Sequence, residues 1–164
     1  MIIIGIGSNL ISNIGNNPQK NCQLALEKMR EFNILPIKVS SFFESAPLPV
    51  STQPWFVNLA VSVKTELDPH KLLNVLLSIE SEMGRRRGVK NAPRVIDLDI
   101  LVFNNLIIKT ESLVLPHPRI VDRAFVLYPI QELNSSWEHP VSGKNIANLI
   151  GNLGNRQLIR VINR

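Results

Sequence analysis

The chain has 164 residues, of which 45% are hydrophobic and 19% are charged, and it carries a formal net charge of +5 with a pI of about 9.7. This length predicts one domain, residues 1–164, and the apolar fraction excludes a disordered chain. The lone cysteine excludes an intrachain disulfide, and no apolar run approaches the ~20 residues of a membrane helix. We therefore expect a cytoplasmic domain without membrane association. As a domain it is expected to be monomeric.

The basic charge suggests nucleic acid or a phosphorylated small molecule as a partner. Lysines are scattered along the chain, and the one dense basic run is Arg85–Lys90. A run this short has the size of a ligand site. We therefore expect a small phosphorylated ligand and no nucleic-acid partner.

The N-terminal part predicts a strand followed by a helix. The apolar run Ile2–Ile6 is typical of a buried strand. Its glycines, Gly5 and Gly7, match the start of a dinucleotide-binding fingerprint, but the third glycine is missing and the signal is weak. Asn17, followed by a proline, has the preferences of an N-cap and a first helical residue, and helical spacing of apolar residues continues to Phe32.

Two strands and a second helix are expected next. Alternation predicts strands over residues 37–45 and 56–65, separated by a proline-rich loop. Asp68 and Pro69 then begin a helix, and Gly84 ends it as the residue after the C-cap. The face of the second strand that we expect to meet the core consists of Val57, Leu59, Val61 and Val63.

The stretch PRVIDLDIL, residues 93–101, is the strand candidate that we expect to carry the chemistry. Because strand side chains alternate, Asp97 and Asp99 share one face and lie roughly 7 Å apart. Such carboxylates repel unless a cation lies between them, and Mg²⁺ takes carboxylate and phosphate oxygens as ligands. A solvated strand face with two acids is the alternative interpretation. The basic run Arg85–Lys90 just upstream favours a polyphosphate bound with its metal.

The C-terminal third predicts a hairpin, two helices and a strand. The Asn104–Asn105 pair suits a tight turn, followed by a returning strand over residues 106–109. Short helices are expected over residues 119–127 and 145–153, and a last strand over residues 157–162.

The order of these elements predicts the fold class. Strand, helix, strand, strand, helix, strand is the split βαβ pattern of ferredoxin-like α+β folds. It implies a mainly antiparallel sheet with the two long helices on one face. The additional hairpin and helices extend this to a three-layer α-β-α arrangement.

Several motifs together resemble the 6-hydroxymethyl-7,8-dihydropterin pyrophosphokinase family. The segments that carry the resemblance are GSNL (7–10), SSFF (40–43), QPWFVN (53–58), PRVIDLDIL (93–101), PHPR (116–119) and RAFVL (123–127). The resemblance implies an ATP-dependent enzyme of folate biosynthesis. It would transfer pyrophosphate from ATP to the pterin hydroxymethyl group and release AMP, using two magnesium ions.

The resemblance also implies a role for particular residues. Asp97 and Asp99 would hold both magnesium ions and, with Arg85 and Arg94, form the catalytic set. The residues implied in ATP binding are Glu80, Arg85, Arg87, Arg94, Ile100, His117 and Arg123. Those implied in pterin binding are Ser45, Ala46, Leu48, Phe56, Asn58 and Phe125. In this set two phenylalanines sandwich the pterin ring, and the asparagine amide and loop backbone read its edge.

Two other functions are compatible with the same fold class. A ferredoxin-like RNA-binding domain is favoured by the basic charge, but it would need exposed aromatic side chains in an RNP-type motif. The sequence contains no such motif, and its aromatic content is 5%. The second alternative is a non-catalytic ligand sensor, which the intact acid pair and arginines disfavour.

Overall fold

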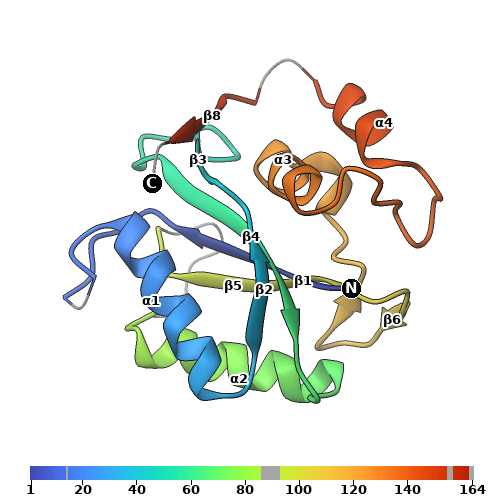
Figure 1. Ribbon diagram of the computed structural model, residues 1–164. Helices are drawn as coiled ribbons and strands as arrows, with labels where there is room; N and C mark the ends of the chain where they lie inside the picture. The colour runs from blue at the N-terminus through green and yellow to red at the C-terminus, as the bar shows by residue number, and fades with distance from the viewer. Residues whose placement is uncertain (14, 86–92, 155–156, 163–164) are drawn as a thin grey trace.

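The structure is a computed structural model, and it describes residues 1–13, 15–85, 93–154 and 157–162 (Figure 1). The strands are β1 (Ile2–Ser8), β2 (Leu35–Val39), β3 (Phe42–Ser45), β4 (Phe56–Lys64), β5 (Asp97–Phe103), β6 (Ile108–Lys109), β7 (Val114–Leu115) and β8 (Ile159–Ile162). The helices are α1 (Pro18–Glu31), α2 (Pro69–Glu82), α3 (Ala124–Leu133) and α4 (Ile146–Gly151), with a 3₁₀ turn η1 (Ile120–Asp122) before α3.

The main sheet has the order β5-β1-β4-β3-β8, and β2 pairs with the part of β4 that β3 leaves open. The strand pairs in this sheet are antiparallel. β1 and β4 lie side by side in the centre, although α1 and two strands separate them in the chain. This is the predicted ferredoxin-like α+β fold.

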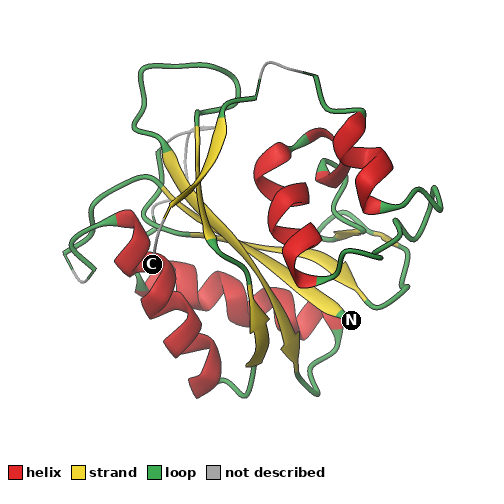
Figure 2. Ribbon diagram, turned by 45° about the horizontal axis from the view of Figure 1, so that its top comes forward, coloured by secondary structure: helices red, strands yellow, loops and turns green. Residues whose placement is uncertain are grey.

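Helices cover both faces of the sheet (Figures 1 and 2). α1 and α2 lie on one face, while α3 and α4 lie on the other. Each face has its own core cluster: Ile4, Leu59 and Leu76 belong to the α1–α2 side, and Ala60 and Leu127 to the α3 side. The face of β4 that carries Ala60 is therefore buried as well, because α3 packs on it. The expectation of one core side on this strand was incomplete.

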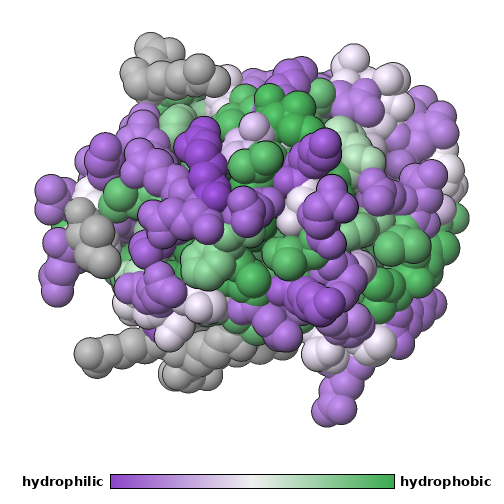
Figure 3. All heavy atoms as spheres, turned by 60° about the horizontal axis from the view of Figure 1, so that its bottom comes forward, coloured by the Kyte–Doolittle hydropathy of each residue, from purple (hydrophilic) through white to green (hydrophobic). Residues whose placement is uncertain are grey.

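The two long helices begin where the sequence predicts. The Asn17 side chain accepts a hydrogen bond from the Lys20 N–H at 2.8 Å, and Asp68 accepts one from the Lys71 N–H at 2.9 Å. Gly84 follows α2 with φ +90°, a conformation that favours glycine after a helix. The outward side of this layer carries many hydrophilic side chains with hydrophobic patches between them (Figure 3).

Three predicted elements differ from the observed ones. The strand expected over residues 37–45 is two strands, because Ser40 interrupts it with hydrogen bonds to the backbone of Ala60 at 3.0 Å. The turn at Asn104 exists, with φ 52°, but β6 pairs with β7 and does not return along β5. The helix expected over residues 119–127 is the 3₁₀ turn followed by α3, because Arg123 between them is extended.

The C-terminal elements are confirmed with shorter bounds. α4 has Asn145 as its N-cap, and β8 pairs with β3 at the edge of the sheet. The longest helices, α1 and α2, have 14 residues each. Within the part of the chain that the structure describes, no helix combines the length and apolarity needed to cross a membrane.

Candidate active site

The predicted acid pair lies at the start of β5, beside the end of β1. Asp97 is opposite Gly7 and Asp99 is opposite Gly5 in the antiparallel register. Both carboxylates line one cavity, as the alternation of the strand predicts. By the same alternation Leu101 lines the cavity, and the register shift at this residue brings Val102 to the α3 side of the sheet as well.

The two glycines of β1 lie beside the acids and form part of the cavity wall. A β-carbon on Gly5 would lie 3.1 Å from Leu101 Cδ1, and one on Gly7 would lie 3.2 Å from the Asn58 side-chain oxygen. Both glycines are inside the strand and not in a phosphate-binding turn. Their lack of side chains keeps the space in front of Asp97 and Asp99 open.

The environment of Asp99 opposes its negative charge. Burial raises the pKa of Asp99 to about 7, and the neighbouring negative charge of Asp97 adds to this increase. Arg123 acts in the opposite direction but does not cancel these effects. A bound cation would relieve the repulsion between the carboxylates and favour their ionised forms.

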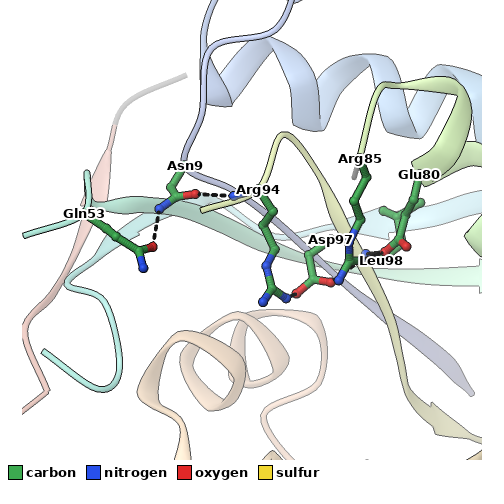
Figure 4. A network of polar contacts seen from close by, with 7 residues as sticks. All are labelled: Asn9, Gln53, Glu80, Arg85, Arg94, Asp97 and Leu98. Carbon is green, nitrogen blue, oxygen red and sulfur yellow. Dashed lines mark hydrogen bonds and ion pairs between the residues drawn. The ribbon is translucent and has the colours of Figure 1, made fainter. Parts of the chain in front are cut away.

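Two arginines compensate the charge of Asp97 (Figure 4). Arg85 Nη1 lies 2.5 Å from one carboxylate oxygen of Asp97, and Arg94 Nη1 lies 2.5 Å from the other. Burial acts to lower the pKa of Arg85, but the charges of Asp97 and Glu80 outweigh it and raise that pKa. Two predicted catalytic arginines thus meet one predicted metal ligand.

Glu80 at the end of α2 connects this network to the protein interior. Only 1% of Glu80 is exposed, and its side chain accepts a hydrogen bond from the Leu98 N–H at 2.7 Å and pairs with Arg85. Burial raises the pKa of Glu80 above its ordinary value and outweighs the opposite effects of the Leu98 N–H and Arg85. The structure places Glu80 behind Arg85, where it positions the arginine and β5 and does not line the cavity.

A second set of polar contacts holds Arg94 and was not assigned a role from the sequence. The Asn9 side chain accepts a hydrogen bond from the Arg94 N–H at 2.8 Å. Its amide group donates to the Gln53 side chain at 3.3 Å and to the Pro54 carbonyl at 3.1 Å (Figure 4). Asn9 and Gln53 lie in GSNL and QPWFVN, so the motifs themselves were the available signal.

The predicted pterin residues come together in the same cavity as the acid pair. Six of six line it: Ser45, Ala46, Leu48, Phe56, Asn58 and Phe125. The Asn58 amide donates to the Ser45 hydroxyl at 2.9 Å, which fixes the amide at the cavity wall. Arg123 also lines the cavity, and its guanidinium carbon lies 5.4 Å from the centre of the Phe125 ring.

The remaining predicted nucleotide residues lie in different surroundings. His117 lies in a neighbouring groove beside β7, where its Nδ1 accepts a hydrogen bond from the Arg119 N–H at 3.1 Å. Burial and the charge of Arg123 lower the pKa of His117 to about 4, so the ring is neutral at pH 7 and carries its proton on Nε2. Ile100 is 4% exposed, and its side chain belongs to the core on the α1–α2 side. Arg87 lies outside the described residues.

The cavity offers two protein ligands for a metal ion. Within the described residues no group of three or more His, Cys, Asp or Glu side chains converges on one point. Mg²⁺ is commonly bound by one or two carboxylates together with substrate phosphate oxygens and water. Asp97 and Asp99 fit that pattern, and they do not form a cage that would hold a metal without a substrate.

Comparison with known proteins identifies the family. The profile of the 7,8-dihydro-6-hydroxymethylpterin-pyrophosphokinase family matches residues 3–135. A 2-amino-4-hydroxy-6-hydroxymethyldihydropteridine pyrophosphokinase of Haemophilus influenzae is 36% identical over 159 residues, which are 96% of each chain. The chain therefore belongs to the 7,8-dihydro-6-hydroxymethylpterin-pyrophosphokinase family.

Other relatives are much longer proteins. The folic acid synthesis protein fol1 of Pneumocystis carinii is 41% identical over 146 residues, which are 89% of this chain and 19% of that protein. A solved HPPK-DHPS structure of Plasmodium falciparum superposes with a TM-score of 0.69 at 18% identity, covering 92% of this chain and 43% of that one. At this identity the structural similarity supports the fold alone. The chain spans about a fifth of the length of the fol1 relative.

Proposed function

We propose that this protein transfers the pyrophosphoryl group of ATP to the hydroxymethyl oxygen of 6-hydroxymethyl-7,8-dihydropterin, a step of folate biosynthesis. In this reaction the hydroxymethyl oxygen forms a bond to the β-phosphorus of ATP and loses its proton. The bond between that phosphorus and the oxygen leading to the α-phosphate breaks, and AMP leaves. The proposal rests on family membership and on the contents of the cavity.

One observation carries the proposal: the acid pair and the aromatic side chains belong to a single cavity. Asp97 and Asp99 line it together with Phe56, Phe125 and Asn58. A flat heterocycle held between two aromatic rings, with an amide at its edge, would present its substituent to the acid pair. Holding both reactants in such an arrangement supplies most of what this class of reaction requires.

Magnesium is the cation that best fits the acid pair, and we propose two ions, as in the family. When bound with ATP, these ions would neutralise phosphate charge and orient the reacting groups. Asp97 and Asp99 are the residues that would hold them. Asp97 is engaged by Arg85 and Arg94 in the structure, so it would exchange these partners for the metal.

Arg85 and Arg94 are the residues we propose to receive the phosphates. A guanidinium group has forked donors that suit phosphate oxygens. If Asp97 held a metal ion, its carboxylate would pair less strongly with Arg85 and Arg94, and both guanidinium groups could bind the triphosphate instead. During this exchange Glu80 would still contact the Arg85 guanidinium, and Asn9 would still accept from the Arg94 backbone N–H.

The alternative of an RNA-binding domain is not favoured. RNA-binding sheets of this topology present aromatic side chains on an open face, where bases stack. Here helices cover both faces of the sheet (Figure 2), and the cavity carries two carboxylates. We further propose that residues 1–164 act as one monomeric domain.

The identity of the nucleotide product tests the proposed reaction. Incubation with ATP, magnesium and 6-hydroxymethyl-7,8-dihydropterin is expected to yield AMP and the pterin pyrophosphate in equal amounts, as measured by chromatography. ADP as the nucleotide product would refute pyrophosphoryl transfer. Binding of both ligands without turnover would instead support the ligand sensor.

Removing one of the two aromatic rings tests whether the cavity binds the pterin separately from ATP. Phe125→Ala is expected to weaken pterin binding by ~1–3 kcal/mol, the scale of one aromatic stack. Binding of an unreactive ATP analogue should change little, because its phosphate contacts remain. Tyr128→Ala, which removes an exposed aromatic ring from the same helix, is the matched control. Calorimetry that finds equal losses for both ligands would assign Phe125 to the core.

A further inference from the structure

A C-terminal segment beyond the residues matched by the family profile packs beside the cavity. That profile ends at residue 135, whereas β8 and the two residues before it are residues 157–162. β8 pairs with β3, and Ser45 lies opposite Ile159 in this pair. The chain therefore returns, after α4, to a strand whose last residue lines the proposed pterin pocket.

The side chain of Gln157 is hydrogen-bonded on both sides of Arg123. Its amide oxygen accepts a hydrogen bond from the Ala124 N–H at 2.8 Å. Its amide nitrogen donates to the Asp122 carbonyl at 2.7 Å. One amide group thus satisfies a backbone donor and a backbone acceptor that lie two residues apart.

These bonds replace a cap that the local sequence does not supply. α3 begins at Ala124, and the side chain of its N-cap residue, Arg123, makes no capping hydrogen bond. The first N–H groups of a helix have no partner within the helix, and a side chain normally accepts from one of them. Here the acceptor comes from a residue 33 positions later in the chain.

The neighbours of Gln157 hold the other side of the cavity. The Leu158 carbonyl accepts a hydrogen bond from the Ala46 N–H at 3.1 Å. Arg160 makes two hydrogen bonds to Glu44, at 2.8 and 2.6 Å, and its guanidinium carbon lies 5.5 Å from the centre of the Trp55 ring. Residues 157–160 are thus bonded both to the β3 end of the cavity and to the start of α3.

We propose that Gln157 is a positioning residue for the pterin pocket, and this rests on the function proposed above. By fixing the backbone around Arg123, it sets where the side chains of Arg123 and Phe125 stand relative to Ser45 and Ala46. It touches neither substrate. Its contribution is to fix the distance between the start of α3 and the end of β3. Gln157 bonds to the first of these, and the next residue, Leu158, bonds to the second.

Gln157→Met removes both hydrogen bonds and retains the length and most of the volume of the side chain. The KM for the pterin is expected to rise about tenfold, the scale of one or two neutral hydrogen bonds lost. The KM for ATP should rise less, because only Arg123 among the implied ATP-binding residues is positioned by Gln157. Arg85 and Arg94 are held by Glu80, Asp97 and Asn9. Amide hydrogen exchange at Ala124 should become faster, since that N–H loses its acceptor.

Two further variants separate positioning from general destabilisation. Gln157→Glu keeps an acceptor for the Ala124 N–H and places negative charge at a helix N-terminus, which is favourable. It should restore protection at Ala124 and part of the pterin KM. Gln131→Met makes the same chemical change further along α3. The Gln131 side chain has no hydrogen bond among the described residues, so both KM values should stay unchanged.

The outcomes distinguish this proposal from the proposed function. If the unmodified protein forms no pterin pyrophosphate, the function itself fails. If it is active and Gln157→Met has the same pterin KM, the positioning role is refuted. Equal increases in both KM values, with a lower melting temperature and no recovery in Gln157→Glu, would also overturn it in favour of a purely structural bond.

Discussion

Asp99→Asn is expected to lower magnesium-dependent turnover about a thousandfold, which corresponds to ~4 kcal/mol of lost transition-state stabilisation. The substitution keeps the shape of the side chain and removes one of the two carboxylates that line the cavity. With one carboxylate, the protein holds metal poorly, and the phosphate charge is insufficiently neutralised as AMP leaves. Steady-state assays over a range of magnesium concentrations measure this loss.

The free protein should not be destabilised by the same change. Burial and the charge of Asp97 both raise the pKa of Asp99, so ionised Asp99 is unfavourable in the folded state without a cation. An amide at this position is expected to leave the melting temperature equal or higher. Asp68→Asn, at the N-terminus of α2, is the matched control, because asparagine also serves as an N-cap. Near-normal turnover in Asp99→Asn would exclude Asp99 as an essential metal ligand.

Glu80→Ala is expected to have the largest effect on stability. It leaves the buried Leu98 N–H without this acceptor and removes one of the carboxylates that Arg85 contacts. Removing one member of a buried ion pair costs ~3–5 kcal/mol, and we expect the lower end because Arg85 retains Asp97. For a protein of this size, ~3 kcal/mol corresponds to a fall in melting temperature of roughly 6–12 °C. Thermal unfolding followed by circular dichroism measures it.

Two further variants test whether the loss of stability comes from the buried contacts of Glu80. Glu80→Gln retains an oxygen for the Leu98 N–H and should lose less stability than Glu80→Ala. Glu82→Ala removes an acid two residues along the chain, whose side chain is 45% exposed and bonded to Lys28 on the surface. Such surface pairs contribute about 0–1 kcal/mol. Equal melting temperatures for Glu80→Ala and Glu82→Ala would refute the structural role assigned to Glu80.

The parts of the fold that the sequence predicts are those with strong local signals. The caps at Asn17 and Asp68, the glycine after α2 and the alternation around Asp97 and Asp99 each depend on a few adjacent residues. The break at Ser40 was missed because it depends on hydrogen bonds to Ala60 in another strand. Similarly, the second buried face of β4 depends on α3, which follows far along the chain.

The candidate site divides in the same way. Residues whose chemistry is visible from type and motif, such as Phe56, Asn58 and Phe125, were identified in advance and line the cavity. The supporting contacts were not, because the partners of Asn9 and Gln157 are brought near only by the completed sheet. The position of Glu80 behind Arg85 required the same long-range information, since its Leu98 contact crosses from α2 to β5.

The fate of the β-phosphorus of ATP tests the central claim most directly. The reaction would be run with ATP labelled at the β-phosphorus, in the presence of magnesium and 6-hydroxymethyl-7,8-dihydropterin, and the products would be separated. We expect the label in the pterin product and unlabelled AMP as the nucleotide, because both the β- and γ-phosphates are transferred together. Label recovered in ADP, with a singly phosphorylated pterin, would contradict pyrophosphoryl transfer.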